Sequence, residues 1–288
     1  IIALLIAMLL PALSRARLSL AYMFGTMGSS LVLTFAGRFY DRFGARVTGP
    51  VAAVGLSLVL LGLSQCDRLA GRLAAATGFG AATAAFAVML AGFFALRFFG
   101  QGVMTMVGRN MIAKWFERRR GLANGIGSVF VAFAFSACPL LFSVLIDGFG
   151  WRGAWVRLAG IIGVGILAVM AVFYRDNPEQ SGLRPDGAKP GDGGADDQPL
   201  APVHYTLAQA VRTYSFWAFA LPLALLALLV TGLTFHVVSI FDAAGMTRDE
   251  AFAIFLPGAV ISVTLSLTGG WLSDRVRLKY LLAALCVG

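Results

Sequence analysis

The chain has little charge, and its charged residues avoid the long apolar runs. Charged residues make up 13% of the 288 positions, apolar residues make up 59%, and the mean hydropathy is +0.82. A water-soluble chain of this length needs far more charge to cover its surface. Every Asp and Glu falls in a predicted loop or at a predicted helix end. The composition therefore excludes a soluble globular protein. It also leaves the apolar runs without a buried carboxylate, the usual proton carrier inside membranes.

Cysteine is scarce as well. Cys66, Cys138 and Cys286 lie singly in apolar surroundings, without the spacing of a metal site or a disulfide framework. We interpret them as packing residues and expect neither a metal nor a cofactor. The net charge of +9 does not indicate nucleic acid, because the Lys and Arg residues gather at the ends of apolar runs, as membrane topology requires.

Several apolar runs reach the roughly 20 residues that a helix needs to cross about 30 Å of hydrocarbon. They predict an all-α polytopic membrane protein. The predicted helices are the tail of one ending near residue 13, then about 18–36, 47–63, 83–107, 122–146, 153–174, 212–240 and 251–272, and the start of a further one. Residues 65–72 read as a short loop between two of them. Ile1 and Gly288 both lie inside apolar runs, so we expect a fragment of a longer protein.

Residues 175–204 differ in kind, being rich in Pro, Gly and Asp. Such a segment buries too little apolar surface to order itself fully. We predict a first transmembrane half over 1–174, a linker over 175–211 and the beginning of a second half over 212–288.

The basic residues predict an orientation. On the linker's side of the membrane lie fifteen: Arg38, Arg42, Arg46, Arg109, Lys114, Arg118, Arg119, Arg120, Arg175, Arg184, Lys189, Arg212, Arg275, Arg277 and Lys279. On the other side lie seven: Arg15, Arg17, Arg68, Arg72, Arg152, Arg157 and Arg248. Because cytoplasmic loops carry the excess of Lys and Arg, we expect a multi-pass protein of the cell membrane with its linker in the cytoplasm.

Two junctions between apolar runs share one pattern. Residues 37–46 read G-R-F-Y-D-R-F-G-A-R, and residues 270–275 read G-W-L-S-D-R, with Gly, Asp and Arg at the same spacing. An Asp beside the start of the following helix would favour its dipole, and Arg side chains can bind carbonyl groups at neighbouring helix ends. A simpler interpretation is a plain topological anchor. The repeat indicates one structural half used twice.

The first junction resembles the signature loop of the major facilitator superfamily. The resemblance implies a secondary active transporter of six plus six helices that works by alternating access. It also implies that the two junctions form a conformational latch, whose residues would be Gly37, Asp41, Arg42, Gly44, Arg46, Gly270, Asp274 and Arg275.

Three segments also resemble the bacterial branch related to monocarboxylate and oxalate–formate transporters: residues 114–123, 177–187 and 234–245. This resemblance implies small organic anions as cargo. Carriers of that branch often place a cation in the helix predicted here at 251–272, which has none. The alternative is an exporter of an uncharged or amphipathic compound, although the G-P-x-x-G-G pattern of many drug antiporters is absent from 122–146.

Three residues are candidates for substrate binding or coupling. Arg97 is the only unambiguous charge deep in a predicted span, and it opens a segment that resembles the fourth-helix motif of the superfamily. Because an arginine at mid-helix costs about 2.5–3.5 kcal/mol, it should face the bundle interior and have a partner. It binds either a substrate carboxylate or neighbouring carbonyl groups. Gln101 offers a polar group nearby. His236 could exchange protons near neutral pH or be a satisfied interfacial histidine.

Other classes of function fit less well. A membrane enzyme would need clustered His, Asp or Glu at one membrane face, and a sensor would need a signalling domain. We expect a monomer in the lipid bilayer, an anionic small-molecule substrate, protons as a candidate coupling ion, and no nucleic-acid partner.

Overall fold

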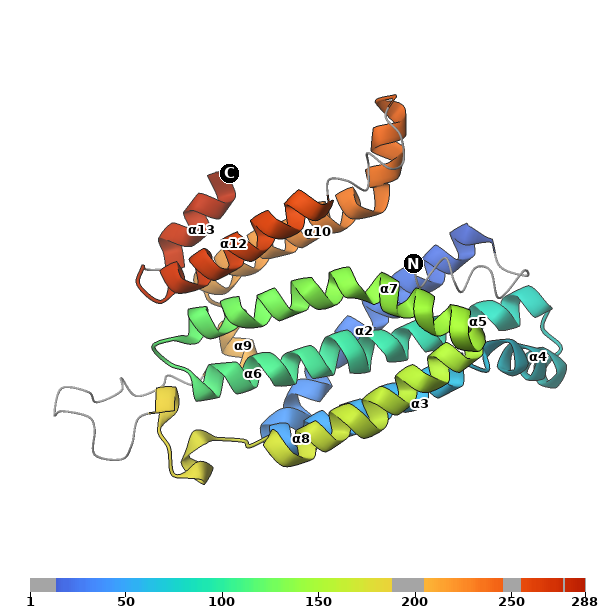
Figure 1. Ribbon diagram of the computed structural model, residues 1–288, viewed down its shortest axis with the longest axis horizontal. Coiled ribbons are helices and arrows are strands. Elements are labelled where there is room, and N and C mark those ends of the chain that lie inside the picture. The colour runs from blue at the N-terminus through green and yellow to red at the C-terminus, as the bar shows by residue number, and fades with distance from the viewer. Residues whose placement is uncertain (1–13, 188–204, 246–254, 277, 288) are drawn as a thin grey trace. The chain divides into compact units, whose positions relative to one another are not determined.

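The computed structural model describes residues 14–187, 205–245, 255–276 and 278–287, and all regular elements within these ranges are helices (Figure 1). The long ones are α2 (Arg15–Phe43), α3 (Ala45–Leu63), α5 (Ala81–Leu96), α7 (Arg120–Gly160), α10 (Tyr214–Ala243) and α12 (Phe255–Ser273). The short ones are α4 (Cys66–Thr77), α6 (Thr105–Trp115), α8 (Leu167–Phe173), α9 (Leu207–Ala210) and α13 (Leu278–Val287). Two π-helical segments, η1 (Arg97–Met104) and η2 (Ile161–Ile166), continue α5 into α6 and α7 into α8. The fold class is therefore confirmed as all-α.

Four stretches of the described chain are long and apolar enough to cross a membrane: Ala16–Phe43, Ala45–Leu63, Ala81–Trp115 and Leu141–Phe173. Two shorter apolar helices, Tyr214–Val230 and Val260–Ser273, follow. These stretches overlap the helices predicted from the sequence, apart from the first predicted helix, which lies outside the described residues. The chain is a multi-pass membrane protein.

The described residues form two compact units. The first contains the chain up to Glu117 together with Ala134–Gly187, and the second contains Arg118–Phe133 together with the described residues from Tyr205 onward. Helix α7 therefore begins in the second unit and continues in the first. Its backbone breaks once, at Gly150, where φ is +65°.

Glycine lets the helices of the first unit approach closely. A Cβ on Gly25 of α2 would lie 2.9 Å from the backbone nitrogen of Phe94 in α5, and one on Gly55 of α3 would lie 2.6 Å from the ring of Phe99. Close contact of this kind replaces the hydrophobic effect as the force that joins helices in lipid. These contacts fix α2 and α3 against the span that carries Arg97 (Figure 1).

Two predicted loops are largely helical. The junction 37–46 continues α2 as far as Phe43 and turns only at Gly44, where α3 follows at once. Residues 66–77, predicted in part as a loop, form α4. In α4, Cys66 and Ala70 are buried while Arg68 and Arg72 are exposed, so the polar residues lie on one side of an amphipathic helix.

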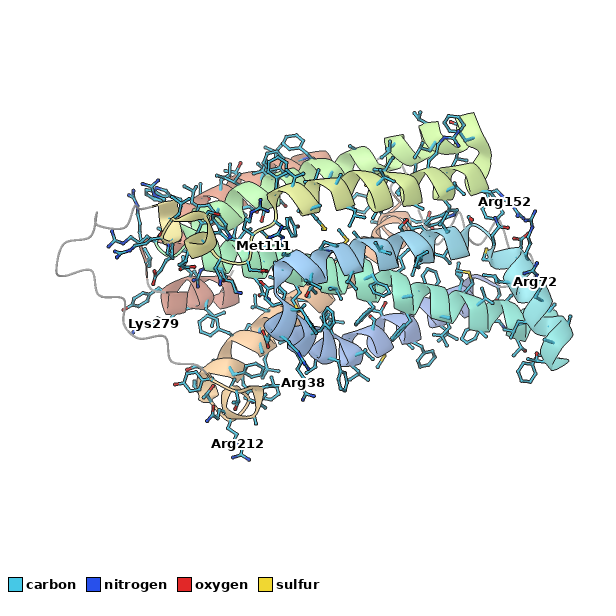
Figure 2. The ribbon with its side chains drawn as sticks, turned by 90° about the horizontal axis from the view of Figure 1, so that it is seen from below. Arg38, Arg72, Met111, Arg152, Arg212 and Lys279 are labelled. Atoms are coloured by element: carbon cyan, nitrogen blue, oxygen red, sulfur yellow. The ribbon has the colours of Figure 1, made fainter. Side chains whose placement is uncertain are left out.

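An ion pair ties α4 to the bend in α7. Arg152, two residues after the break at Gly150, donates a hydrogen bond to the Asp67 carboxylate, and its guanidinium lies 4.7 Å from the centre of the Trp151 ring. Figure 2 shows Arg72 and Arg152 at the same end of the first unit. Asp67 also lies in the first turn of α4, where a negative charge favours the helix dipole.

The segment after α8 packs on the first unit at the end that carries Gly44. The indole Nε1 of Trp115 donates to the carbonyl oxygen of Arg175 at 3.3 Å, and the backbone N–H of Glu117 donates to Asp186 Oδ2 at 3.1 Å. The segment contains the 3-10 turns η3 (Pro178–Ser181) and η4 (Pro185–Gly187), and Asp186 belongs to the second. The linker predicted from residue 175 therefore begins with thirteen ordered residues of the first unit, 175–187; residues 188–204 lie outside the described part.

Candidate functional site

Gly44 forms the whole turn between α2 and α3. Its φ is +74°, a conformation that residues with a Cβ rarely adopt, and its N–H donates to the carbonyl oxygen of Tyr40 at 2.8 Å. A Cβ at this position would also collide with the Asp176 carboxylate. Glycine is therefore required both by the backbone and by the side chain that lies against it.

Asp176 occupies the N-terminus of α3. Its Oδ1 accepts the backbone N–H of Arg46 at 2.9 Å, which satisfies one of the unpaired donors of that helix end and places a negative charge at the positive end of its dipole. From the sequence, Asp41 was expected to favour the dipole of this helix. Asp41 lies exposed in the last turn of α2, before the turn at Gly44. Among the described residues Asp41 has no hydrogen-bond or ion-pair partner.

Asp274, in the second junction, follows the end of α12 and lies against the N-terminus of another helix, α7. Its two carboxylate oxygens accept the N–H groups of Gly121 at 2.6 Å and Leu122 at 2.8 Å, at the start of α7. The neighbouring Arg275 guanidinium lies 4.0 Å from the centre of the Trp271 ring. The Asp of the second junction thus binds a helix that belongs to the first half of the sequence.

Small residues allow α7 and α12 to cross at this point. A Cβ on Gly125 would lie 2.7 Å from the carbonyl oxygen of Ser266, and a Cβ on Gly121 or Gly270 would collide with the backbone of the other. The spacings Gly121–Gly125 and Ser266–Gly270 are both of the small-x-x-x-small type that brings helix backbones together in lipid. The carboxylate of Asp274 and this crossing fix the same two helix ends.

Arg97 is the first residue of η1 and is half-buried. Its Nε donates to the hydroxyl oxygen of Thr26 at 3.2 Å, and its guanidinium carbon lies 5.2 Å from the centre of the Tyr22 ring. Both partners are on α2. In the described part of the chain no carboxylate lies within ion-pair distance of Arg97. The partner required by a charge at this depth is therefore a hydroxyl and an aromatic face, neither of which neutralises it.

The π-helical form of η1 surrounds Arg97 with an irregular backbone. π-Helical turns are rare in proteins overall, and where they do occur they are often found at functional sites. Gln101 lies in the same segment and is exposed, and its side chain makes no hydrogen bond within the described residues. His236 lies in α10, but its side chain is outside the described part, so its predicted role is untested.

The exposed side of the span Ala81–Trp115 carries no large apolar residue. Its exposed positions are Ala81, Thr83, Ala87, Ala91, Gln101, Thr105, Arg109 and Lys114. In α3 the exposed positions after Arg46 are instead Val47, Val51, Val54, Leu58 and Leu61. Lipid favours a surface of large apolar side chains such as that of α3. A span whose exposed side is small and polar faces water or another helix rather than hydrocarbon.

The sequence did not indicate Asp176, Tyr22 or Thr26, because their roles depend on contacts between residues far apart in the chain. A weak signal for Asp176 was present: an acidic residue stands three positions after the end of α8, in R-D-N-P. No group of three or more His, Cys, Asp or Glu residues that could hold a metal ion exists among the residues that the structure places.

A family model described as Major Facilitator Superfamily matches residues 1–288. No curated protein matches the chain, and no solved structure matches it.

Proposed function

The chain belongs to the Major Facilitator Superfamily, a family of membrane transporters, and from this premise we propose that it is a secondary active transporter for small organic anions such as monocarboxylates, working by alternating access. The observation that carries the proposal is the Arg97 guanidinium. It lies midway along a membrane span, near an exposed side that is small and polar, and it has no carboxylate partner among the described residues.

The geometry of Arg97 suits a carboxylate. Its Nε is engaged by Thr26, which holds the guanidinium in one orientation. The two terminal nitrogens are left to form a pair of parallel hydrogen bonds with a carboxylate, the arrangement that distinguishes Arg from Lys. An arriving anion would neutralise a charge that is otherwise costly at this depth. Arg97 would thus supply binding energy and would also select a negatively charged substrate.

The small, polar side of the Arg97 span supports an aqueous path beside it. Gln101 and Thr105 would each lose several kcal/mol of hydration if they faced hydrocarbon without partners. Water or a passing solute satisfies them instead. The apolar exposed face of α3 meets lipid under the same proposal.

Alternating access requires contacts that exist in one state and break in the other. Asp274 and the N-terminus of α7 provide one: two hydrogen bonds to an exposed carboxylate, together worth roughly 0.5–2 kcal/mol, between parts of the two halves of the sequence. The repeat of the junction extends the proposal to Asp41. By equivalence, Asp41 would bind the helix of the second half that corresponds to α7.

The test is uptake of a panel of labelled monocarboxylates by proteoliposomes containing the full-length protein. Arg97→Gln should abolish binding and uptake, and Arg97→Lys should retain the charge but weaken affinity by about tenfold or more through loss of the paired hydrogen bonds. Arg72→Gln, a charge removed from α4 at the far end of the unit, is the matched control and should transport normally.

Unchanged anion affinity in a well-folded Arg97→Gln protein would show that Arg97 is structural and would overturn the proposed substrate class. Uptake of an uncharged compound but of no anion would favour the exporter instead. If an acid outside the described residues neutralises Arg97, then removing that acid together with Arg97 should restore folding that either single change disturbs.

A further inference from the structure

Arg109, counted from the sequence among the basic residues on the linker's side, lies on the exposed side of α6, in the same long helical stretch as Arg97. It precedes Trp115, the last residue of α6, by six positions, or about 9 Å along the helix axis. Twelve residues separate it from Arg97, which is no more than about 18 Å at the α-helical rise. The guanidinium has no hydrogen-bond, ion-pair or ring partner among the described residues. This sets it apart from Lys114, whose Nζ lies 5.3 Å from the centre of the Tyr40 ring.

Gln101, Thr105 and Arg109 follow one another at intervals of four residues, which places neighbours on the same side of a helix. All three are exposed, and none forms a hydrogen bond within the described part of the chain. The opposite side of the same stretch is buried through Val103 and Val107. Three exposed polar side chains without a hydrogen-bond partner among the described residues thus form a row that leads from Arg97 to Arg109.

A lipid-facing arginine would reach along the helix to the membrane surface and place its stem against hydrocarbon. The exposed positions one and two turns before Arg109, Thr105 and Gln101, do not fit such a face because they are polar, while its large apolar neighbours Met106 and Ile112 are half-buried. The positive charge of Arg109, donors from Gln101 and the hydroxyl of Thr105 instead match an anion with several acceptor oxygens.

We propose that Arg109, with Thr105 and Gln101, forms a second binding site for small carboxylates, which receives the anion between Arg97 and the end of the span that carries Trp115. The proposal rests on the proposed function in that the anion is the transported one. It adds a residue that sets affinity on one side of the membrane only, whereas Arg97 would act on binding from both sides.

The experiment measures whether an anion is concentrated at this row, without using the transport substrate. Thr105→Cys is placed in full-length protein from which the native cysteines have been removed. The introduced thiol is treated with an anionic methanethiosulfonate, which bears a sulfonate, and with the cationic analogue, which bears an ammonium group. Val51→Cys, on the apolar exposed face of α3, is the matched control and should react slowly with both reagents.

The expected result is that the thiol at position 105 reacts with both reagents. Its preference for the anionic reagent, relative to a free thiol, should be about tenfold higher, and this preference should be lost in Thr105→Cys with Arg109→Gln. A thiol that is unreactive at position 105, or a preference unaffected by Arg109→Gln, would overturn the proposal. Arg109→Lys, which keeps the charge, should retain most of the preference.

Sided transport distinguishes this inference from the proposed function. In vesicles of known orientation, Arg109→Gln should raise the KM for labelled monocarboxylates about tenfold on the side that carries Trp115 and leave the KM on the other side unchanged. The control is Arg38→Gln, which removes a charge from the C-terminal part of α2, and it should change the KM on neither side. Equal KM changes on both sides would contradict a one-sided site, while loss of anion transport only in Arg97→Gln would leave the proposed function standing without Arg109.

Discussion

Asp274 binds the N-terminus of α7, 153 positions away from it at Gly121, through both oxygens of its carboxylate, at 2.6 Å to the N–H of Gly121 and 2.8 Å to that of Leu122. Asp176 binds the N-terminus of α3 from 130 positions away, through one oxygen, at 2.9 Å to the N–H of Arg46. Both caps come from a distant part of the chain. The hydrogen bonds of such a carboxylate exist only while the two segments are in contact, so they break when the segments separate.

Substitution of Asp274 should act on transport more than on folding. In Asp274→Asn the amide can keep one acceptor bond to the α7 N-terminus but loses the charge that strengthens it. We expect normal expression and insertion, because the spans partition by their own hydropathy, and transport slowed by tenfold or more. Uptake assays with surface-expression controls measure this. Wild-type uptake would show that the cap is dispensable.

Asp41→Asn is expected to resemble Asp274→Asn, because the repeated junction places the two acids at equivalent positions. Asp147→Asn, an exposed acid that accepts a hydrogen bond from Ser143 at 3.2 Å within one helix, is the control and should transport normally. If Asp41→Asn also transports at the normal rate, the first junction serves topology alone.

Substitution of Asp176 should act on stability instead. Asp176→Ala removes the cap of α3 and should lower the free energy of unfolding by about 1–2 kcal/mol. Asp176→Asn, which keeps an acceptor, should cost about half as much. Thermal unfolding in detergent measures the difference. Equal stability of all three proteins would mean that the α3 terminus is satisfied by water.

The crossing of α7 and α12 should not tolerate a larger residue. Gly270→Leu would collide with the backbone of Gly121, so the two helix ends should separate. Thermal unfolding in detergent should therefore occur at a lower temperature for Gly270→Leu than for Gly269→Leu, the control, because a Cβ at Gly269 meets no atom within 4 Å. Equal unfolding temperatures for the two variants would argue against a close crossing.

The buried Cys66 should be unreactive. Burial raises the pKa of its thiol, and the Asp67 carboxylate adds to the rise, so a higher pH than usual is needed to form the thiolate that reacts. With Cys138 and Cys286 replaced by serine, we expect negligible maleimide labelling at neutral pH and complete labelling after denaturation in detergent. Rapid labelling of the native protein would show that the α4 end opens.

The predicted orientation is tested at Ser181, an exposed residue of η3. Ser181→Cys in a cysteine-free background should resist an impermeant thiol reagent in intact cells and react after permeabilisation, because the excess of Lys and Arg predicts that this segment is cytoplasmic. Labelling from outside would reverse the orientation.

The sequence was a good guide to what hydrophobicity controls. The helix predicted from Val47 to Leu63 begins at Ala45 and ends at Leu63, because burial in a membrane leaves one way to satisfy the backbone of an apolar run. It was a poor guide to the charged stretches. Residues 65–72 read as a loop because their composition is polar, although the period of their polarity suits the amphipathic helix α4.

Contacts between distant residues could not be predicted. The sequence indicated that Arg97 needs a partner but not that the partner would be Thr26, 71 positions earlier. It also gave no sign of the wide turns of η1, since π-helical backbone depends on packing rather than on any residue preference. For the same reason the sequence indicated Asp41, a neighbour in the chain, as the negative charge near the start of α3, and it did not indicate the hydrogen bond from Arg46 to Asp176.

The positions of Asp176 and Asp186 determine where the chain could be split into two fragments that reassemble. Both lie beyond the last helix of the first half, yet both bind backbone groups within it, at Arg46 and at Glu117. A gene split after Tyr174 would give a first fragment without these two caps. A split after Gly187 would leave them on the fragment that uses them, so co-expressed fragments should reassemble better from the later division.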